Sequence, residues 1–363
     1  MSMDGPLAAM GWNAGFDAAF RPHRIVGRVP GRVVAEERGQ FVVHDGAVTH
    51  AASVSGRLRH ESNGDALAFP AVGDWVALGG TMSGERATIH AILARRSMIV
   101  RRAPTDHRAV AQIIAANVDT VFIVTSLNDE LNVRRVERYL SVAWESGAVP
   151  VIVLSKADLN ADIDAHRMAV SAVATGVDVI VASGLTGVGI ADIRTLLSPG
   201  RTVAFIGSSG VGKSTLVNAL AGEELMTVSG IREDDARGRH TTTRRQLVAL
   251  AEGLVIDTPG MRELALLDGD GLARAFVDVG EIARGCRFAD CGHRSEPGCA
   301  IRLALASGLL DAERFRAFEK LEREAGRSER ANAVVARQAE RRKWTAISKD
   351  VGRQMREKYG DER

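Results

Sequence analysis

Residues Gly207-Ser208-Ser209-Gly210-Val211-Gly212-Lys213-Ser214-Thr215 fit the phosphate-loop pattern G-x-x-x-x-G-K-[ST]. The apolar run Thr202–Ile206 before it predicts a buried strand, and Thr215–Leu220 after it predicts a helix. The loop glycines allow backbone N–H groups to approach phosphate oxygens, and the helix N-terminus adds partial positive charge. A glycine-rich turn without a ligand is the alternative, and the strand–loop–helix context argues against it.

Two side chains of this loop carry the chemistry expected at phosphates. Lys213 can reach the β- and γ-phosphates, and the Ser214 hydroxyl can bind Mg²⁺. We therefore predict Lys213 as a catalytic residue and Ser214 as an Mg²⁺ ligand. The loop residues predicted to bind the nucleotide are Gly207, Ser208, Ser209, Gly210, Val211, Gly212, Lys213, Ser214 and Thr215.

Two segments that follow other apolar runs indicate a guanine base. Ser155-Lys156-Ala157-Asp158 resembles the guanine motif N-K-x-D. Asp158 would accept two hydrogen bonds from guanine N1 and N2, which adenine does not offer, and Lys156 would lie along the base. Ala182-Ser183-Gly184 resembles the base-contacting S-A-x loop, which makes Ser183 a candidate. A P-loop ATPase or kinase is the rival interpretation, and Asp158 argues against it.

Two further segments predict how Mg²⁺ and the γ-phosphate are bound. Asp257-Thr258-Pro259-Gly260 fits D-x-x-G, so Asp257 would hold Mg²⁺ through water and the Gly260 N–H would contact the γ-phosphate. The run Thr241-Thr242-Thr243 lies between the phosphate loop and D-x-x-G, where a switch threonine completes the Mg²⁺ shell. We favour Thr242 for this role, and its two neighbours remain open.

The order of these segments along the chain is unusual, because the base-binding segments precede the phosphate loop. A GTPase sheet can still form after circular permutation, since the original chain ends lie close together. For residues 99–270 we predict a parallel, doubly wound α/β domain, with strands at 120–125, 149–154, 177–181, 202–206, 246–250 and 254–257 and helices at 134–146, 164–174 and 190–197. The segment after Gly260 then leads directly into the C-terminal region, so the nucleotide state can be transmitted to it.

The N-terminal third has a different pattern. Residues 1–23 are small and polar, and we predict a flexible arm there. Residues 24–98 show five short candidate strands separated by turns such as Asp45-Gly46 and Asn63-Gly64, which predicts a small β-barrel of the OB type. Periodicity alone does not distinguish an OB barrel from an SH3-like one.

All three cysteines of the chain lie in one short loop of the C-terminal region, 271–363, which otherwise reads as helical. The spacing Cys286-x4-Cys291-x-His293-x5-Cys299 supplies three thiols and one imidazole. Such a set is typical of a tetrahedral structural zinc site, which keeps no open position for catalysis. We predict one structural Zn²⁺ held by Cys286, Cys291, His293 and Cys299, with free structural thiols as the alternative.

Composition and charge bear on partners and location. The chain has 363 residues and a net charge of +2, with no apolar run long enough to span a membrane. No basic segment followed by an apolar core occurs within residues 1–20, so we expect a cytoplasmic protein with reduced thiols. Arginines gather in the N-terminal third and basic clusters end the chain, which suits a polyanion, although a solvated charged surface is the common outcome.

With these residues in hand, nearly the whole chain resembles the ribosome small-subunit-dependent GTPase A family, RsgA or YjeQ. The resemblance rests on Gly207–Ser214, Gly238-Arg239-His240-Thr241-Thr242-Thr243, Asp257–Gly260 and the cysteine–histidine spacing. It implies an OB-type barrel, a circularly permuted GTPase domain and a zinc-binding helical module. It also implies a monomeric cytoplasmic enzyme that binds the 30S subunit and its 16S rRNA, acts late in subunit maturation and is stimulated by the subunit. A non-hydrolytic, GTP-dependent RNA-binding switch is the alternative function.

Two departures from the usual GTPase pattern matter. Ser155 stands where the common guanine motif has Asn, and its shorter hydroxyl is expected to leave one bracing contact to water. Met261 stands where many GTPases carry a Gln that orients the attacking water, so we expect slow intrinsic hydrolysis. His240 beside the switch threonines is our candidate for the missing catalytic group, and a solvated loop histidine is the alternative.

Overall fold

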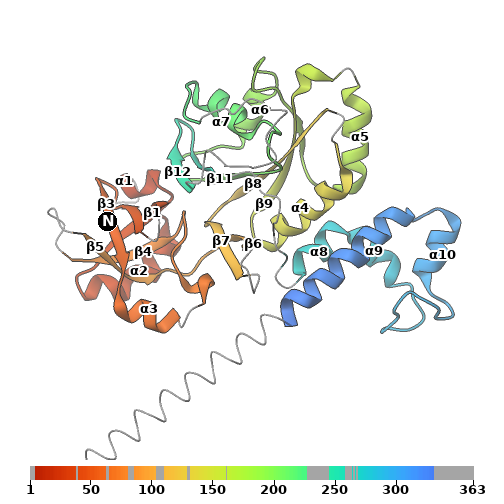
Figure 1. Cartoon of the computed structure of the whole chain (residues 1–363), viewed down its shortest axis with the longest axis horizontal. Helices are drawn as coiled ribbons and strands as arrows, with labels where there is room; N and C mark the ends of the chain where they lie inside the picture. The colour runs from red at the N-terminus through yellow and green to blue at the C-terminus, as the bar shows by residue number, and fades with distance from the viewer. Residues whose placement is uncertain are drawn as a thin grey trace, which may run out of the picture.

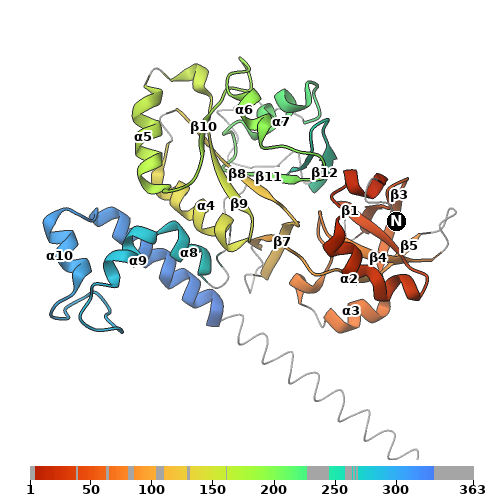
Figure 2. The same cartoon turned by 180° about the vertical axis from the view of Figure 1, so that it is seen from behind.

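The computed structural model describes residues 5–37, 40–62, 65–80, 86–103, 110–128, 131–160, 162–226, 245–257, 264, 266 and 269–330. They form an N-terminal β-barrel, a central α/β domain and a C-terminal helical module (Figure 1). The central domain contacts both of the others, which extend from it in different directions (Figures 1 and 2). Within the described part of the chain, every helix is too short or too polar to cross a membrane.

The N-terminal barrel consists of β1 (Val29–Glu37), β2 (Gln40–His44), β3 (Thr49–Val54), β4 (Trp75–Gly79) and β5 (Ala87–Ile92). Its strands follow the order β1-β2-β3-β5-β4, and an additional β1–β4 pairing closes the ring. The β3–β5 pair is parallel, and the short helix α3 (Gly56–Ser62) follows β3. This closed order with one parallel pair confirms the OB-type prediction over the SH3-like alternative.

The prediction of a flexible arm is wrong for residues 5–23. They form helices α1 (Pro6–Ala9) and α2 (Ala14–Ile25). Trp12, Phe16 and Phe20 are buried against Trp75 of the barrel, with ring centroids of Trp12 and Trp75 4.7 Å apart. Phe16 and Phe20 lie four residues apart on one face of α2, and their burial together with Trp12 outweighs the polar, glycine-containing composition on which the prediction relied.

The central domain confirms the predicted parallel, doubly wound arrangement. Its strands are β8 (Thr120–Ser126), β9 (Val149–Ser155), β10 (Val179–Val181), β11 (Thr202–Ile206), β12 (Arg245–Ala249) and β13 (Leu254–Asp257), in the order β10-β9-β8-β11-β13-β12. Only β12 runs antiparallel to its neighbour β13. Helices α4 (Val133–Glu145) and α5 (Ile163–Val173) contribute to one apolar core, and α6 (Ile190–Thr195) and α7 (Lys213–Ala221) to another. The sheet therefore has helices on both faces.

Backbone pairing joins the barrel to the central domain. Strand β1 pairs antiparallel with β12, so barrel and domain share one eleven-stranded sheet. Beside this joint, the buried guanidinium of Arg32 donates to the Thr202 hydroxyl at 2.8 Å and to the carbonyl oxygens of Gly73 and Met10. Burial lowers the pKa of Arg32 to about 10. A second sheet, the hairpin β6 (Met98–Ala103) and β7 (Val110–Ala116), was not predicted from the sequence.

The C-terminal module consists of α8 (Asp270–Ala275), α9 (Val277–Ala283), α10 (Ala300–Ser307) and a helix at 312–330. It packs on α4 rather than on the sheet (Figures 1 and 2). The approach is close, because a Cβ on Gly271 of α8 would lie 2.0 Å from the Ser141 carbonyl oxygen of α4. One continuous apolar core runs from Leu140 of α4 to Phe276, Ile301 and Phe315 of the module.

Candidate nucleotide site and metal cluster

The phosphate loop connects β11 to α7 at the carboxyl edge of the parallel strands. Gly207 has φ 152° and Gly212 has φ 92°, a region that L side chains rarely adopt. A Cβ at Gly207 would lie 2.4 Å from the Val124 carbonyl oxygen, so only glycine lets the loop leave β11 beside β8. The loop thereby starts α7 at Lys213, with the backbone N–H groups of the first turn at the sheet edge.

Lys213 is held inside the loop. Its side chain donates to the carbonyl oxygens of Gly207 at 2.8 Å and Ser208 at 2.6 Å. Burial lowers the pKa of Lys213 to about 8, and the nearby Asp257 carboxylate at the end of β13 opposes that shift. Burial likewise raises the pKa of Asp257, against the attraction of Lys213. The loop thus holds an ammonium group whose charge a bound anion would stabilise.

Ser155 braces the phosphate loop directly, which corrects the expectation that a water would be needed. Its buried hydroxyl lies 2.6 Å from the Val211 carbonyl oxygen and 3.2 Å from that of Thr125. Val211 belongs to the phosphate loop and Thr125 to β8. A serine is long enough here because the end of β9 lies close to the loop. A Cβ added at Gly212 would lie only 3.9 Å from the Ser155 Oγ.

The base-binding segments interlock. The buried Ser183 hydroxyl donates to Asp158 Oδ1 at 2.5 Å and accepts from the backbone N–H groups of Leu185 and Thr186 at 3.2 Å. Gly184 packs against α7, where a Cβ would lie 2.8 Å from the Thr215 carbonyl oxygen. Ser183 therefore fixes the exposed Asp158 carboxylate at the sheet edge that also holds the phosphate loop.

The structure brings the described candidate residues to one edge of the sheet. Ser155, Lys156, Ala157 and Asp158 follow β9, Ser183 follows β10, Gly207–Thr215 follow β11, and Asp257 ends β13. This is the edge at which open parallel sheets bind ligands. His240, Thr242, Gly260 and Met261 lie outside the described residues, so their predicted roles remain predictions.

Two side chains beside the phosphate loop were missed by the sequence analysis. Arg135 Nη1 donates to the Ser208 hydroxyl at 3.0 Å, and the Tyr139 hydroxyl lies 3.5 Å from the same oxygen. Both belong to α4, which follows β8, and they line a small pocket with Thr125 and Val211. Their place near the start of a helix that follows a central strand was the only available signal.

The cysteine–histidine cluster forms as predicted from its spacing. The ligand atoms of Cys286, Cys291, His293 and Cys299 all lie within 4.8 Å of one another. Cys286 and Cys299 Sγ are 3.9 Å apart, and His293 Nδ1 lies 3.6 Å and 3.5 Å from them. A tetrahedron with zinc–sulfur bonds of about 2.3 Å has sulfur–sulfur edges of about 3.8 Å, so the cluster fits a metal ion.

A carboxylate organises the loop that carries two of these ligands. Glu296 accepts hydrogen bonds from the backbone N–H groups of Gly292, Arg294 and Ser295 at 2.9–3.0 Å. These bonds hold the turn in which His293 adopts a left-handed backbone with φ 59°. The backbone N–H bonds also lower the pKa of Glu296 to about 2.

Comparisons with known proteins agree with this geometry. Residues 92–267 match the family model described as RsgA GTPase. The chain is 48% identical to the small ribosomal subunit biogenesis GTPase RsgA 2 of Lactiplantibacillus plantarum, over 82% of this chain and 84% of that protein. It is 40% identical to the small ribosomal subunit biogenesis GTPase RsgA of Syntrophotalea carbinolica, over 98% of this chain and 99% of that one.

Solved structures give the same result for the fold. The crystal structure of YjeQ from Thermotoga maritima superposes with a TM-score of 0.61 at 25% identity, over 82% of this chain and 98% of that one. The structure of YloQ, described as a circularly permuted GTPase, superposes with a TM-score of 0.56 at 22% identity, over 82% of this chain and 95% of that one. The permuted order expected from the motifs is thus found in a protein of similar fold.

Proposed function

The chain belongs to the RsgA GTPase family, and from this membership we propose that it hydrolyses GTP to GDP and phosphate in the service of small-ribosomal-subunit biogenesis. The observation that carries the proposal is the joint placement of the phosphate loop, Asp158 and Asp257 at one sheet edge. Ser155 joins the segment after β9 to the phosphate loop, and Ser183 joins Asp158 to the segment after β10, which preorganises this part of the edge.

Each side chain at this edge has a proposed role. Asp158 accepts the N1 and N2 hydrogen bonds of guanine, and Lys156 lies along the base. Lys213 leaves the carbonyl oxygens of the loop and neutralises the β- and γ-phosphates. Ser214, Asp257 and, in the undescribed segment, Thr242 would hold Mg²⁺, which supplies positive charge to the phosphates when bound.

Hydrolysis itself is proposed to depend on the segment that follows α7. Met261 offers no hydrogen bond to an attacking water, so the intrinsic rate is expected to be on the order of 10⁻⁴–10⁻² per second. His240 is proposed to orient that water or to move a proton once the protein is bound to the subunit. Gly260 is proposed to contact the γ-phosphate through its backbone N–H.

The proposed partner is the 30S subunit with its 16S rRNA, in the cytoplasm, bound by a monomer. The names of the curated relatives support the subunit, and arginines of the N-terminal third such as Arg21, Arg28 and Arg57 suit phosphates. The cysteine–histidine cluster is proposed to hold one structural Zn²⁺. Four protein ligands leave no position for a substrate, so the ion would order the module rather than react.

Multiple-turnover phosphate release tests this function. Purified protein with Mg²⁺ and GTP should release phosphate slowly alone and much faster with purified 30S subunits, while Lys213→Ala should release none in either case. If GTP binds and no phosphate is released even with 30S subunits, the protein is a non-hydrolytic GTP-dependent RNA-binding switch instead.

A further inference from the structure

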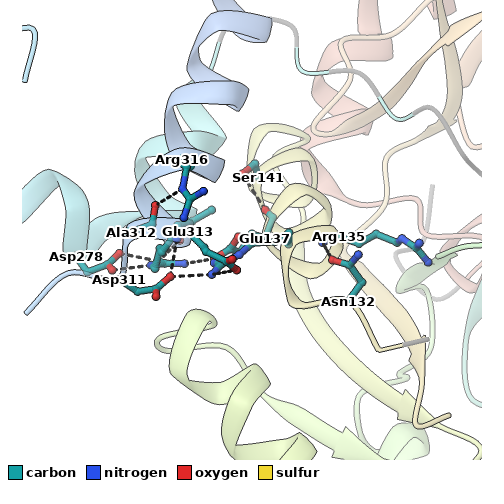
Figure 3. Close-up of polar contacts among 12 residues, drawn as sticks. Asn132, Arg135, Glu137, Ser141, Asp278, Asp311, Ala312, Glu313 and Arg316 are labelled. Carbon is teal, nitrogen blue, oxygen red and sulfur yellow. Dashed lines mark hydrogen bonds and ion pairs between the residues drawn. The ribbon is translucent and has the colours of Figure 1, made fainter. Parts of the chain in front are cut away.

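Helix α4 contacts the phosphate loop on one face and the C-terminal module on the opposite face. Figure 3 shows Arg135 and Glu137 pointing to opposite sides of this helix. Arg135 Nη1 donates to the Ser208 hydroxyl at 3.0 Å, and the carbonyl oxygen of the same Ser208 accepts from Lys213 Nζ at 2.6 Å. A displacement of Arg135 therefore acts on the residue that also positions the phosphate-binding lysine.

The opposite face of α4 is joined to the C-terminal module by an ion-pair network centred on two buried residues, Glu137 and Arg314 (Figure 3). Glu137 Oε1 accepts from Arg134 at 2.7 Å and from Arg314 at 2.8 Å. Arg314 also binds both carboxylate oxygens of Asp278 at 2.6 Å, and Arg134 reaches Asp311 at 2.9 Å. Glu137 and Arg314 are both buried, so separating them would remove one of the two partners of each buried charge.

A second ion pair continues this connection one turn along α4. Arg138 donates to both carboxylate oxygens of Glu324 on the helix at 312–330, each at 2.7 Å. It also donates to the carbonyl oxygen of Leu264, which lies in the segment between β13 and the module, at 2.7 Å. This bidentate pair holds the guanidinium and the carboxylate in one relative orientation.

Packing prevents α4 and the module from sliding past each other. The Gly271 backbone of α8 meets the Ser141 carbonyl of α4 with no space for a Cβ, and the apolar core is shared. Close-packed helices of this kind move together or repack discretely. Any force on the module is therefore transmitted to α4.

We propose that α4 couples the C-terminal module to the phosphate loop and that Arg135 is the positioning residue at its nucleotide end. A shift of the module on partner binding moves α4, and Arg135 then changes the position of Ser208 and the strength with which the loop holds GDP. Coupling is reciprocal, so the bound nucleotide equally biases the module. This proposal rests on the proposed function only in that a guanine nucleotide occupies the phosphate loop.

The test measures the release rate of a fluorescent N-methylanthraniloyl-GDP from full-length protein. Arg135→Ala and Ser208→Ala should each speed release by about threefold or more, and the double variant should release no faster than Ser208→Ala alone, because Arg135 acts through the Ser208 hydroxyl, which also lies 3.5 Å from the Tyr139 hydroxyl. Glu324→Gln should change release by about threefold, and this change should vanish in the Arg135→Ala background. The matched control is Glu322→Gln, exposed on the same helix, which should release like wild type.

Two results would overturn the proposal. One is a Glu324→Gln variant that releases GDP like wild type, and the other is a Glu324→Gln effect that is undiminished without Arg135. Both are distinct from failure of the proposed function, in which wild-type protein would not bind the fluorescent GDP at all.

Discussion

The central domain is joined to its two neighbours in physically different ways. The barrel joins through the β1–β12 pairing, in which Ala35 opposes Gln246 in a fixed register, and through the buried Arg32. The C-terminal module joins through side chains on α4: the Glu137–Arg314 pair, the Arg138–Glu324 pair and the shared core.

The two joints differ in how far they allow motion. A strand slip of one residue reverses every side chain, so the strand-paired joint with the barrel has a single arrangement. Helices that are packed and linked by ion pairs move together, and such a unit can shift by small rotations between alternative arrangements. The barrel is therefore expected to stay fixed relative to the nucleotide site. The C-terminal module and α4 are expected to shift with the bound nucleotide.

Removal of zinc should have the largest effect, because it should destabilise the C-terminal module and leave the barrel unchanged. Structural zinc contributes on the order of 10 kcal/mol to the folding of small zinc modules, and the loop at Cys286–Cys299 is held otherwise by few buried side chains. Metal analysis should find about one zinc per chain by the tetrahedral-site argument. Chelation should then expose the module to limited proteolysis and leave the barrel resistant. A module that stays intact after complete metal loss would contradict this expectation.

A matched pair of arginine variants compares the joints directly. Arg314→Met leaves Glu137 buried without one of its two partners, and we expect a loss of about 3–5 kcal/mol in the free energy of unfolding. Arg32→Met should also destabilise the protein, through unpaired carbonyl oxygens at the barrel joint. Only Arg314→Met should change the rate of GDP release. Equal changes in release for both variants would remove the distinction between the joints. Denaturant unfolding and nucleotide release on the same samples supply both readouts.

Loss of guanine recognition is expected to have a somewhat smaller effect, and it involves neither joint. Asp158→Asn should lose about 2–4 kcal/mol of preference for GTP over ATP, because donors of the base go unpaired. The variant should instead favour XTP, whose base presents an acceptor where guanine has its amino group. Competition binding with GTP, XTP and ATP measures this. A variant that keeps the wild-type order would show that Asp158 does not read the base.

The smallest expected effect is the uptake of a fraction of a proton by Lys213 when the nucleotide binds. Free Lys213 has a pKa of about 8, so it is charged well below that pH and neutral well above it. Bound phosphates favour the charged form, so binding at pH 8 should take up about half a proton, and binding at pH 7 almost none. Calorimetry of GDP binding in buffers of different ionisation enthalpy measures this uptake. Equal uptake at both pH values would mean that Lys213 is not the group that titrates.

The placement of the described candidate residues at one sheet edge could be predicted from the sequence because each motif is local. The phosphate loop, Ser155–Asp158 and Ser183 each follow an apolar run, and parallel strands bring such positions to one edge. The cysteine–histidine spacing is equally local. Strand boundaries in the central domain also fell within about two residues of those observed, the usual uncertainty of element ends.

The joints were not predictable, because they depend on partners far apart in the chain. The β1–β12 pairing and the Arg138–Glu324 pair join residues whose relation appears only after folding. The N-terminal helices were missed for the same reason, since Trp12 and Phe16 gain their burial from Trp75. Deletion of residues 1–98 would therefore disrupt the shared sheet and would not be a clean test of RNA binding.

Amide hydrogen exchange of the whole chain, compared between its GDP-bound form and a form with a non-hydrolysable GTP analogue, shows which joint responds to the nucleotide. Coupling through α4 predicts altered protection in α4 and in the helix at 312–330, with β1 and β12 unchanged between the two nucleotides. Altered protection at the β1–β12 joint, with α4 and the helix at 312–330 the same in both states, would contradict it.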